Sequence, residues 1–354
     1  MPRRRSGISF HPNRYDAVVK KHIYIYSPSG AVRDKHAFRR GLARLKALGH
    51  EVEVDEAALA SHMRFAGDDT VRLAAVHRAA ASGADVALIS RGGYGLTRIL
   101  SGIRYRAVAK AIEAGMLFVG ISDFTAFQNA VLTRSGAITW AGPALCEGFG
   151  VGGKPAMADG QDHGEVAIPD DVMEACFDDL LSGQGEGAGW RQHRETRQTA
   201  TDSIAVHASS TGVGADFHIN KAMLWGGNLS VLTSLLGTPY FPDIKGGILF
   251  LEDVAEHPYR IERMLTQLLH AGVLGRQKAV LLGQFTEFSL VPHDRGYKLQ
   301  TVVDWLRRNL KTPVLTNLPY GHVATKVMLP VGARTDLMVQ GREALLFWGH
   351  QSKA

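Results

Sequence analysis

The chain contains two cysteines in 354 residues and no C-x-x-C pair. It therefore has neither a disulfide framework nor a thiolate metal cluster, and a reducing compartment fits this composition best. No apolar stretch follows the basic residues Arg3–Arg5, because Val18–Tyr26 is interrupted by Lys20, Lys21 and His22. We therefore expect no signal peptide, no transmembrane helix and no membrane contact, and we expect a cytoplasmic location.

A basic stripe is also missing from the sequence. The net charge is +6, but the basic residues after Arg3–Arg5 are scattered and do not alternate with aromatic residues. This argues against a nucleic-acid partner and is compatible with an acidic small-molecule substrate. The histidines of the central region do not have the close spacing that a metal site needs. The length and the 45% hydrophobic content allow two ordinary domains, or one large α/β unit with an appendage.

Short apolar strands alternate with longer helical segments in the first 150 residues. The pattern predicts strands at 23–26, 51–54, 86–89, 116–119 and 138–140, and helices at 31–48, 69–81, 105–114 and 124–132. Such alternation predicts a parallel sheet with helices on both faces. Ligands of these sheets bind beyond the carboxyl ends of the strands, so residues in the turns that follow strands are the first candidates for a site.

The rest of the chain changes in composition after residue 148. Gly, Asp and small residues dominate 149–202, apart from a helix at 170–181, so we interpret this range as an interdomain connection. Further segments predict strands at 247–251, 279–282 and 313–315, helices at 229–236, 258–271 and 299–310, and a β-ribbon at 328–347. The expected division is an arm (1–20), an α/β domain (21–148), the connection (149–202) and a C-terminal domain (203–354).

Ser122 lies on a sharp turn between a predicted strand and a predicted helix, within MLFVGISDFTAFQN (116–129). A serine in this position exposes its Oγ above the sheet edge, and the amide groups that follow favour negative charge at the helix N-terminus. Ser122 fits equally well as a helix N-cap. The usual nucleophile turn also has glycine two residues after the serine, where this chain has Phe124.

Two polar residues in the second half have a similar setting. Glu252 ends an apolar strand, and His322 follows Gly321 in a turn after another strand. A serine hydroxyl becomes nucleophilic when a histidine removes its proton, and the histidine needs a carboxylate partner. Ser122, Glu252 and His322 supply this set. Asp253 is an alternative carboxylate, and a structural role for His322 is also open.

Five motifs follow one another along the chain: RGGYG (91–95), GISDFTA (120–126), WGGNLS (225–230), GILFLEDV (247–254) and LPYGH (318–322). Together they resemble the LD-carboxypeptidase family of serine peptidases, typified by murein tetrapeptide carboxypeptidase. The resemblance covers roughly 23–345. It implies an α/β fold with an N-terminal parallel-sheet domain and a smaller C-terminal α/β domain of β-barrel-like character. It also implies a site between the domains and a homodimer.

The resemblance implies a role for each residue of the serine set. Ser122 would be the nucleophile, His322 the general base and then acid, and Glu252 the residue that orients His322. The amide of Asp123, with that of Gly92 or Gly93, would form the oxyanion hole. The family cleaves the bond between an L-centre (diaminopimelate or lysine) and the terminal D-alanine of peptidoglycan tetrapeptides, and it needs no metal or other cofactor.

The substrate of this family carries a free terminal carboxylate, which binds arginine or a set of N–H donors. Candidates for this contact are Arg91, Tyr94 and Asn228. Asn228 fits equally well as the N-cap of the helix at 229–236, and Tyr94 fits a packing role.

The long connection at 149–202 raises a second possibility. The family includes microcin immunity peptidases, which resemble this chain in a longer loop over the site. They cleave an amide between a peptide remnant and a nucleotide-like group, and Trp190 would then stack on the base. The run EDVAEHPYR (252–260) looks closer to the murein enzymes, so hydrolysis of murein tetrapeptides in peptidoglycan recycling is the first expectation. A third interpretation is a two-domain protein that binds a small ligand without chemistry.

Overall fold

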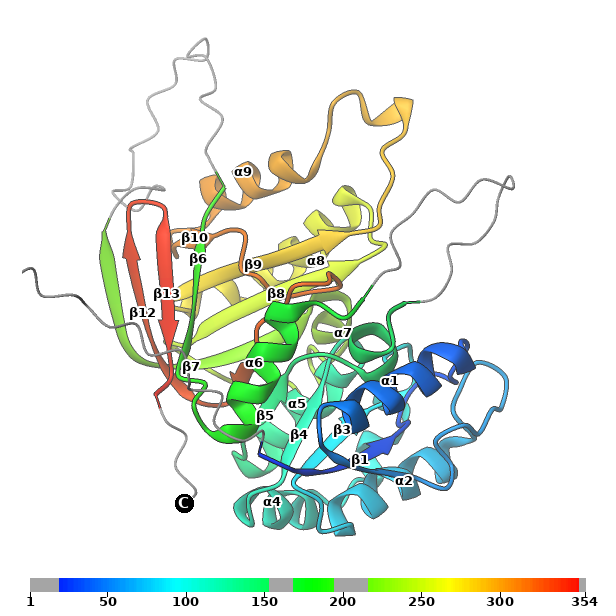
Figure 1. The fold of residues 1–354 in the computed structure, drawn as a ribbon. Coiled ribbons are helices and arrows are strands. Elements are labelled where there is room, and N and C mark those ends of the chain that lie inside the picture. The colour runs from blue at the N-terminus through cyan, green and yellow to red at the C-terminus, as the bar shows by residue number, and fades with distance from the viewer. Residues whose placement is uncertain (1–18, 153–167, 194–215, 350–354) are drawn as a thin grey trace, which may run out of the picture.

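The computed structural model describes residues 19–152, 168–193 and 216–349. These residues form two α/β domains, one built on a mostly parallel sheet and the other on a mixed sheet (Figure 1). The predicted arm (1–20) lies almost wholly outside the described residues. No helix in the described ranges has both the length and the apolar character needed to span a membrane.

The N-terminal sheet contains six strands in the order β11-β5-β4-β3-β1-β2. Five of them are parallel: β1 (His22–Tyr26), β2 (Glu51–Val54), β3 (Val86–Ile89), β4 (Leu117–Gly120) and β5 (Thr139–Ala141). All five were predicted, with ends within one residue. The apolar runs of β3 and β4 are buried, as expected where helices cover both faces of a parallel sheet.

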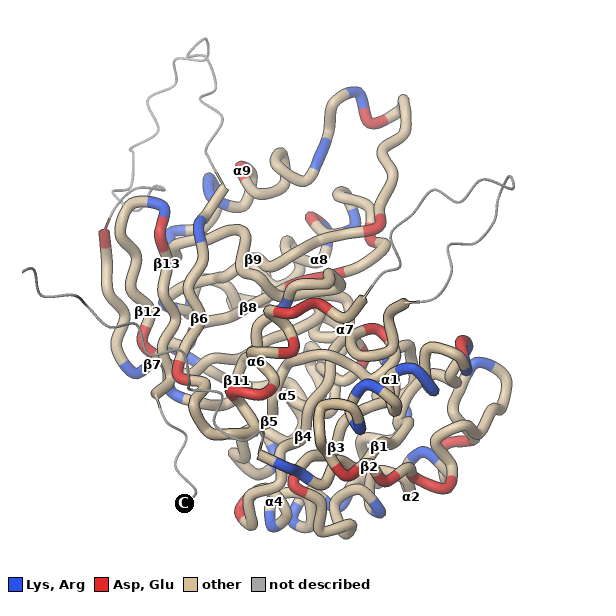
Figure 2. Tube along the Cα trace, in the orientation of Figure 1, with Lys and Arg blue, Asp and Glu red and all other residues tan. Residues whose placement is uncertain are grey.

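The helices of this domain are α1 (Lys35–Ala47), α2 (Asp69–Ala81), α3 (Leu96–Ile99), α4 (Tyr105–Glu113) and α5 (Phe124–Ser135), with a short turn η1 (Leu100–Gly102). Helix α1 starts later than predicted because Asp34 caps it, accepting bonds from two backbone N–H groups. Basic residues gather along α1 (Figure 2). Phe124 to Leu132 of α5 are all buried, so this helix lies inside the core although it carries the polar residues Thr125, Gln128 and Asn129.

The C-terminal sheet contains seven strands in the order β10-β9-β8-β7-β12-β13-β6. They are β6 (Gly187–Arg191), β7 (Phe217–Asn228), β8 (Ile248–Val254), β9 (Ala279–Thr286), β10 (Val314–Leu315), β12 (Arg334–Gln340) and β13 (Glu343–Phe347). Strands β7 to β10 are parallel, whereas β7, β12, β13 and β6 pair antiparallel. The β-barrel-like character expected for this domain takes the form of an open mixed sheet. In the described structure, the edge strands β10 and β6 do not pair with each other.

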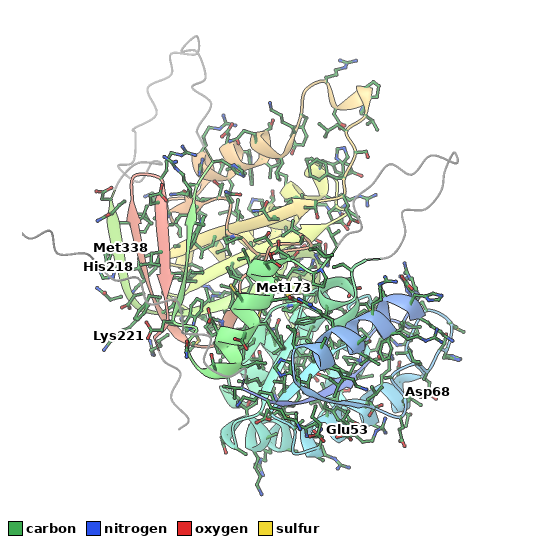
Figure 3. The ribbon with its side chains drawn as sticks, viewed as in Figure 1. Glu53, Asp68, Met173, His218, Lys221 and Met338 are labelled. Carbon is green, nitrogen blue, oxygen red and sulfur yellow. The ribbon has the colours of Figure 1, made fainter. Side chains whose placement is uncertain are left out.

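The helices of the C-terminal domain are α7 (Leu229–Ser234), α8 (Pro258–His270) and α9 (Leu299–Asn309), with the turns η3 (Leu274–Arg276) and η4 (Pro292–Asp294). The antiparallel part of the sheet has one exposed face. Met338 of β12 and its cross-strand neighbour His218 of β7 lie on that face (Figure 3). Alternation of exposed and buried residues along β12 and β13 is typical of such a half-buried sheet.

Two parts of the chain differ from the sequence-based expectation. The ribbon predicted at 328–347 divides between the domains, because β11 (Leu329–Val331) pairs antiparallel with β5 while β12 and β13 form a hairpin. The range 149–202 contains helix α6 (Asp171–Ser182) and strand β6, which pairs with β13 along its whole length. The Gly-rich sequence of β6 still forms an edge strand, since backbone pairing needs no apolar side chain. The domain boundaries themselves stay a prediction.

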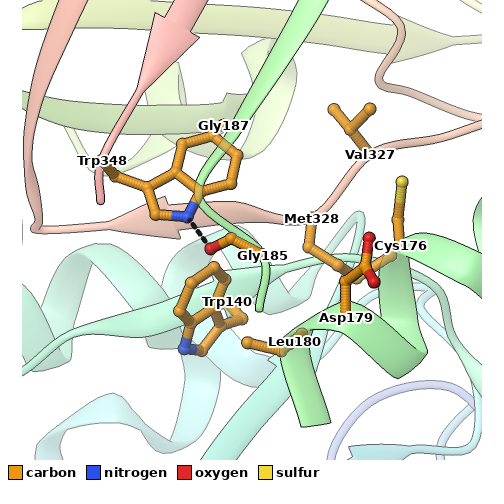
Figure 4. A pocket seen from close by; sticks show the side chains of 9 residues that line it. All are labelled: Trp140, Cys176, Asp179, Leu180, Gly185, Gly187, Val327, Met328 and Trp348. Atoms are coloured by element: carbon orange, nitrogen blue, oxygen red, sulfur yellow. Dashed lines mark hydrogen bonds between the residues drawn. The ribbon is translucent and has the colours of Figure 1, made fainter. Parts of the chain in front are cut away.

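Helix α6 and the strand ends connect the two domains. Asp170, which caps α6, accepts a hydrogen bond of 2.6 Å from Thr325 Oγ1, and Glu174 of α6 pairs with Arg44 of α1. On the other side, Trp348 donates a hydrogen bond of 2.7 Å to the carbonyl of Gly185 and meets the Trp140 ring edge-on beside a small cavity (Figure 4). These contacts join the two domains.

Candidate active site

Ser122 occupies the sharp turn between β4 and α5 and has a backbone φ of +66°. Side-chain-bearing residues rarely adopt this left-handed conformation, and where they do the strain is often functional. The turn is closed by a hydrogen bond of 2.9 Å from the Thr125 amide to the Ser122 carbonyl. Glycine is needed at 120, because a Cβ there would lie 2.6 Å from the Phe124 ring. Phe124 is buried and stacks on Phe127. The packing of α5 therefore explains why this chain has Phe124, and not glycine, two residues after the serine.

The RGGYG turn after β3 lies directly against Ser122. A Cβ added to Gly92 would be 2.6 Å from Ser122 Cβ and 2.8 Å from Ser122 Oγ. Gly93 has a φ of +121°, which glycine adopts readily. Within the described ranges, the amide N–H groups of Gly92, Gly93 and Asp123 donate to no protein acceptor. Unused amide donors beside a serine hydroxyl are what an oxyanion hole requires.

His322 and Glu252 are in direct contact. The Nδ1 atom of His322 lies 2.8 Å from Oε2 of Glu252, whose side chain is fully buried at the end of β8. Burial alone would lower the pKa of His322, but the hydrogen bond and charge of Glu252 outweigh burial, so this pKa is raised from its ordinary value. Since Nδ1 faces the carboxylate, Nε2 is the ring atom available to take a proton from a nucleophile.

Asp253, the alternative partner for His322, faces other groups. Its carboxylate accepts hydrogen bonds of 2.9 and 2.6 Å from the amide and hydroxyl of Ser230, and a further bond of 2.9 Å from Asn228 Nδ2. Burial raises the pKa of Asp253. Asn228 lies between the two carboxylates, and it is Glu252 whose oxygen contacts the His322 ring, so Glu252 is the residue that orients His322.

A chain of hydrogen bonds links the two halves of the site. One turn beyond Ser122, the Thr125 hydroxyl accepts a bond of 2.9 Å from the Asn228 amide. The Asn228 side chain donates to Glu252 Oε1 at 3.2 Å. A Cβ on Gly227 would lie 2.4 Å from Thr125 Oγ1, so glycine permits this approach. Ser122 and His322 are not hydrogen-bonded to each other in the described structure. Catalytic bonds are often long without substrate and shorten in the complex.

The predicted substrate contacts fall into two groups. Tyr94 is 45% exposed beside Phe65, whereas the Arg91 side chain is 17% exposed and lies 3.5 Å from Glu147 Oε1; the substrate contacts of both stay predictions. Asn228 is 4% exposed, and its side chain both caps α7 and binds the two carboxylates of β8. In this structure the Asn228 side chain therefore positions Glu252, and its contact with a substrate stays a prediction.

Trp190, the residue predicted to stack on a base, is buried. It lies on the inner face of β6, is 8% exposed, and donates a hydrogen bond of 3.0 Å to the carbonyl of Thr316. The alternation of burial along β6 explains this position, because Ala188 and Trp190 share the buried face. Trp190 packs in the C-terminal core and offers no ring face for a base. The sequence could not reveal this, since the pairing partner β13 lies far along the chain.

Three residues near the site were not predicted: Thr125, Glu147 and Lys326. Thr125 lies within the GISDFTA motif, which was the available signal, whereas Glu147 and Lys326 have no local signal. The larger cavity, of about 610 Å³, lies at the opposite edge of the N-terminal sheet and includes Met116 and Gly136 in its lining. Among the described residues, no cluster of His, Cys, Asp or Glu is suited to hold a metal ion.

The fold and these strand-end turns define a two-domain α/β protein of the hydrolase type. Residues 23–142 match the LD-carboxypeptidase N-terminal domain, and residues 221–337 match the LD-carboxypeptidase C-terminal domain. The chain belongs to the LD-carboxypeptidase family. Muramoyltetrapeptide carboxypeptidase from Oxalobacter formigenes has a similar crystal structure, with a TM-score of 0.74 and 35% identity over 93% of this chain and 98% of that one.

Two further relatives indicate the range of the family. The probable murein peptide carboxypeptidase of Bacillus subtilis (strain 168) is 28% identical over 85% of this chain and 84% of that protein. The microcin C7 self-immunity protein MccF of Escherichia coli is 26% identical over 69% of this chain and 68% of that protein. Both kinds of relative anticipated from the sequence motifs are therefore present among the similar proteins.

Proposed function

We propose that this protein is a serine carboxypeptidase that hydrolyses the bond between L-diaminopimelate, or L-lysine, and the terminal D-alanine of murein tetrapeptides. The observation that supports the proposal is the contact of His322 with the buried Glu252, which a hydrogen-bond chain connects to the helix that follows the strained Ser122 turn. The names of the relatives from Oxalobacter formigenes and Bacillus subtilis support this substrate class.

In the proposed reaction, Ser122 Oγ attacks the carbonyl carbon of the scissile peptide bond while His322 Nε2 takes the hydroxyl proton. The carboxylate of Glu252 stabilises the imidazolium that forms. The oxyanion binds the amide of Asp123 and that of Gly92 or Gly93, and each such donor contributes about 3 kcal/mol to the transition state. Collapse of the intermediate breaks the C–N bond, and His322 returns the proton to the D-alanine amine.

The second half of the reaction releases the acyl-enzyme. A water molecule gives a proton to His322 and attacks the ester carbon. The ester C–O bond then breaks, and Ser122 regains its proton from His322. The products are D-alanine and a tripeptide with a new carboxylate. The hydrogen bond from Asn228 keeps Glu252 oriented throughout both steps.

The nucleotide-linked alternative loses its main support, because Trp190 is buried. Family resemblance further suggests a cytoplasmic homodimer, and light scattering of the purified protein tests the dimer.

The proposed function is tested with a set of three substrates. We expect D-alanine release from L-Ala-D-Glu-diaminopimelate-D-Ala, no release of alanine from the peptide ending in L-Ala, and no cleavage of an aminoacyl sulfamoyl nucleoside. Cleavage of the nucleoside alone would contradict the murein assignment. Binding of peptide without any turnover would favour a ligand-binding protein.

A further inference from the structure

We propose that the side chain of Asp123 is a positioning group for the oxyanion hole, because it holds the RGGYG turn (91–95) against the turn that carries Ser122. The carboxylate acts through the backbone amides of Gly92 and Gly93 and does not itself touch the substrate. The inference rests on the proposed function and deepens it, since it accounts for how two turns that follow different strands keep their amide groups around one point.

The carboxylate of Asp123 reaches away from its own helix. Asp123 occupies the N-cap position of α5, where aspartate usually accepts hydrogen bonds from amides of the same helix. In the part of the chain that the structure describes, its side chain caps no amide of α5. Asp123 Oδ2 instead accepts a hydrogen bond of 2.9 Å from the amide of Leu96, the first residue of α3. Gly95, the N-cap of α3, has no side chain to cap that helix. Asp123 therefore connects the turn after β3 to the turn after β4.

The peptide group between Gly95 and Leu96 is held at both of its polar atoms. Arg72 Nη1 donates a hydrogen bond of 2.7 Å to the Gly95 carbonyl, while Asp123 accepts from the Leu96 amide. Arg72 is 0% and Asp123 1% exposed, and Arg72 also forms an ion pair with Asp69. Hydrogen bonds to charged groups are stronger than neutral ones, and burial strengthens them further. The end of the RGGYG turn is therefore fixed by two buried charged side chains.

The turn needs such external contacts to keep one shape. Gly93 and Gly95 have φ values of +121° and +143°, and glycine is the most flexible residue of the chain. The bond to Asp123 joins this flexible turn to the residue next to the nucleophile. It therefore sets the distance between the amides of Gly92 and Gly93 and the Oγ atom of Ser122.

The test measures kcat and KM for D-alanine release from the diaminopimelate tetrapeptide, and the rate of Ser122 labelling by a fluorophosphonate, in Asp123→Ala and Asp123→Asn. Loss of one oxyanion donor costs about 100- to 1000-fold in kcat. Asp123→Ala should therefore lower kcat by about 100-fold or more and leave KM nearly unchanged, because the donors act in the transition state. Asp123→Asn keeps an acceptor oxygen for Leu96, and a neutral bond has roughly half the strength of a charged one, so its loss should be about 10-fold. Labelling should slow in the same order.

Asp55→Ala is the matched control. Asp55 is a buried carboxylate of the same domain, 3% exposed, and it accepts hydrogen bonds from Tyr24 and Arg78. Its loss should lower the melting temperature and leave kcat at the wild-type value. Wild-type kcat in Asp123→Ala, or an equal loss of kcat in Asp55→Ala, would overturn the proposal. If Asp123→Ala does not fold, Asp123→Ser takes its place with the same expectation, because the serine hydroxyl is one bond shorter than the carboxylate.

The two readouts separate the positioning role from the proposed function. A wild type that is labelled but releases no D-alanine would contradict the proposed function, and the labelling rates would then decide the role of Asp123. Slower labelling in Asp123→Ala than in Asp55→Ala would support that role, and equal rates would overturn it. A wild type that is neither labelled nor active would overturn both.

Discussion

Replacing Gly92 by alanine tests the site geometry at a single methyl group. The new Cβ would lie 2.6 Å from Ser122 Cβ, whereas ordinary contact begins at 3.4 Å, so the nucleophile and the RGGYG turn must separate by about 0.8 Å. Gly92 has no positive φ, so alanine suits its backbone and the effect is steric. A displacement of about 1 Å between reacting groups costs about 100-fold in rate, and we expect a loss of that size in kcat.

The assay measures D-alanine release together with the melting temperature and the rate of Ser122 labelling by a fluorophosphonate. Overpacking in a rigid site costs about 1 to 3 kcal/mol of stability, so Gly92→Ala should also melt earlier. Gly275→Ala is the matched control, because a Cβ there meets nothing within 4 Å. It should retain wild-type activity and melt no earlier than the wild type. Wild-type kcat and labelling in Gly92→Ala would refute the placement of this turn against the nucleophile.

Three other predictions follow from the polar network. Glu252→Gln should lower kcat by about 10⁴-fold, because a neutral amide does not stabilise the imidazolium, and should lower stability by about 1 to 3 kcal/mol, because glutamine has one acceptor oxygen for the two donors that Glu252 binds. In the wild type, kcat/KM should rise with pH around the pKa of His322, which lies above the ordinary pKa of histidine, since protonated His322 accepts no proton. The raised pKa also stabilises the folded protein at pH values below the pKa that His322 has in the unfolded chain. This stabilisation is lost as the pH rises through the pKa of His322 in the folded protein. An acid limb below the ordinary value in the pH–rate profile would contradict this. Thr125→Val should cost about 1 to 3 kcal/mol in denaturant unfolding, because the buried Asn228 amide loses its acceptor. Thr139→Val is its control and should be neutral, since the Thr139 hydroxyl is buried without a partner in the described structure.

The sequence predicted the parts of the fold that depend on local patterns. Strands β1, β3, β4 and β5 follow from short apolar runs and β2 from alternation, whereas α2 follows from its Ala-rich sequence and α8 from its apolar spacing. The Ser122 turn was also visible, because a strand, a tight turn and a helix follow one another without interruption. The pairing of Glu252 with His322 required the family resemblance, since the two residues are 70 positions apart.

Other features depend on contacts that no local pattern carries. Strand β6 reads as a linker because Gly187 and Gly189 have no side chains to form an apolar face, and only pairing with β13 makes it a strand. Strand β11 falls within the predicted ribbon, but its partner β5 belongs to the other domain. Asn228 and Trp190 have hydrogen-bond partners far along the chain, which no local pattern indicates.

The most direct test of the central claim is D-alanine release from the diaminopimelate tetrapeptide by the wild type and by Ser122→Ala under identical conditions. Ser101→Ala, at an exposed position of η1, is the matched control. We predict release by the wild type and by Ser101→Ala, and loss of release in Ser122→Ala with an unchanged melting temperature. Release that persists in Ser122→Ala would contradict the assignment of Ser122 as the nucleophile.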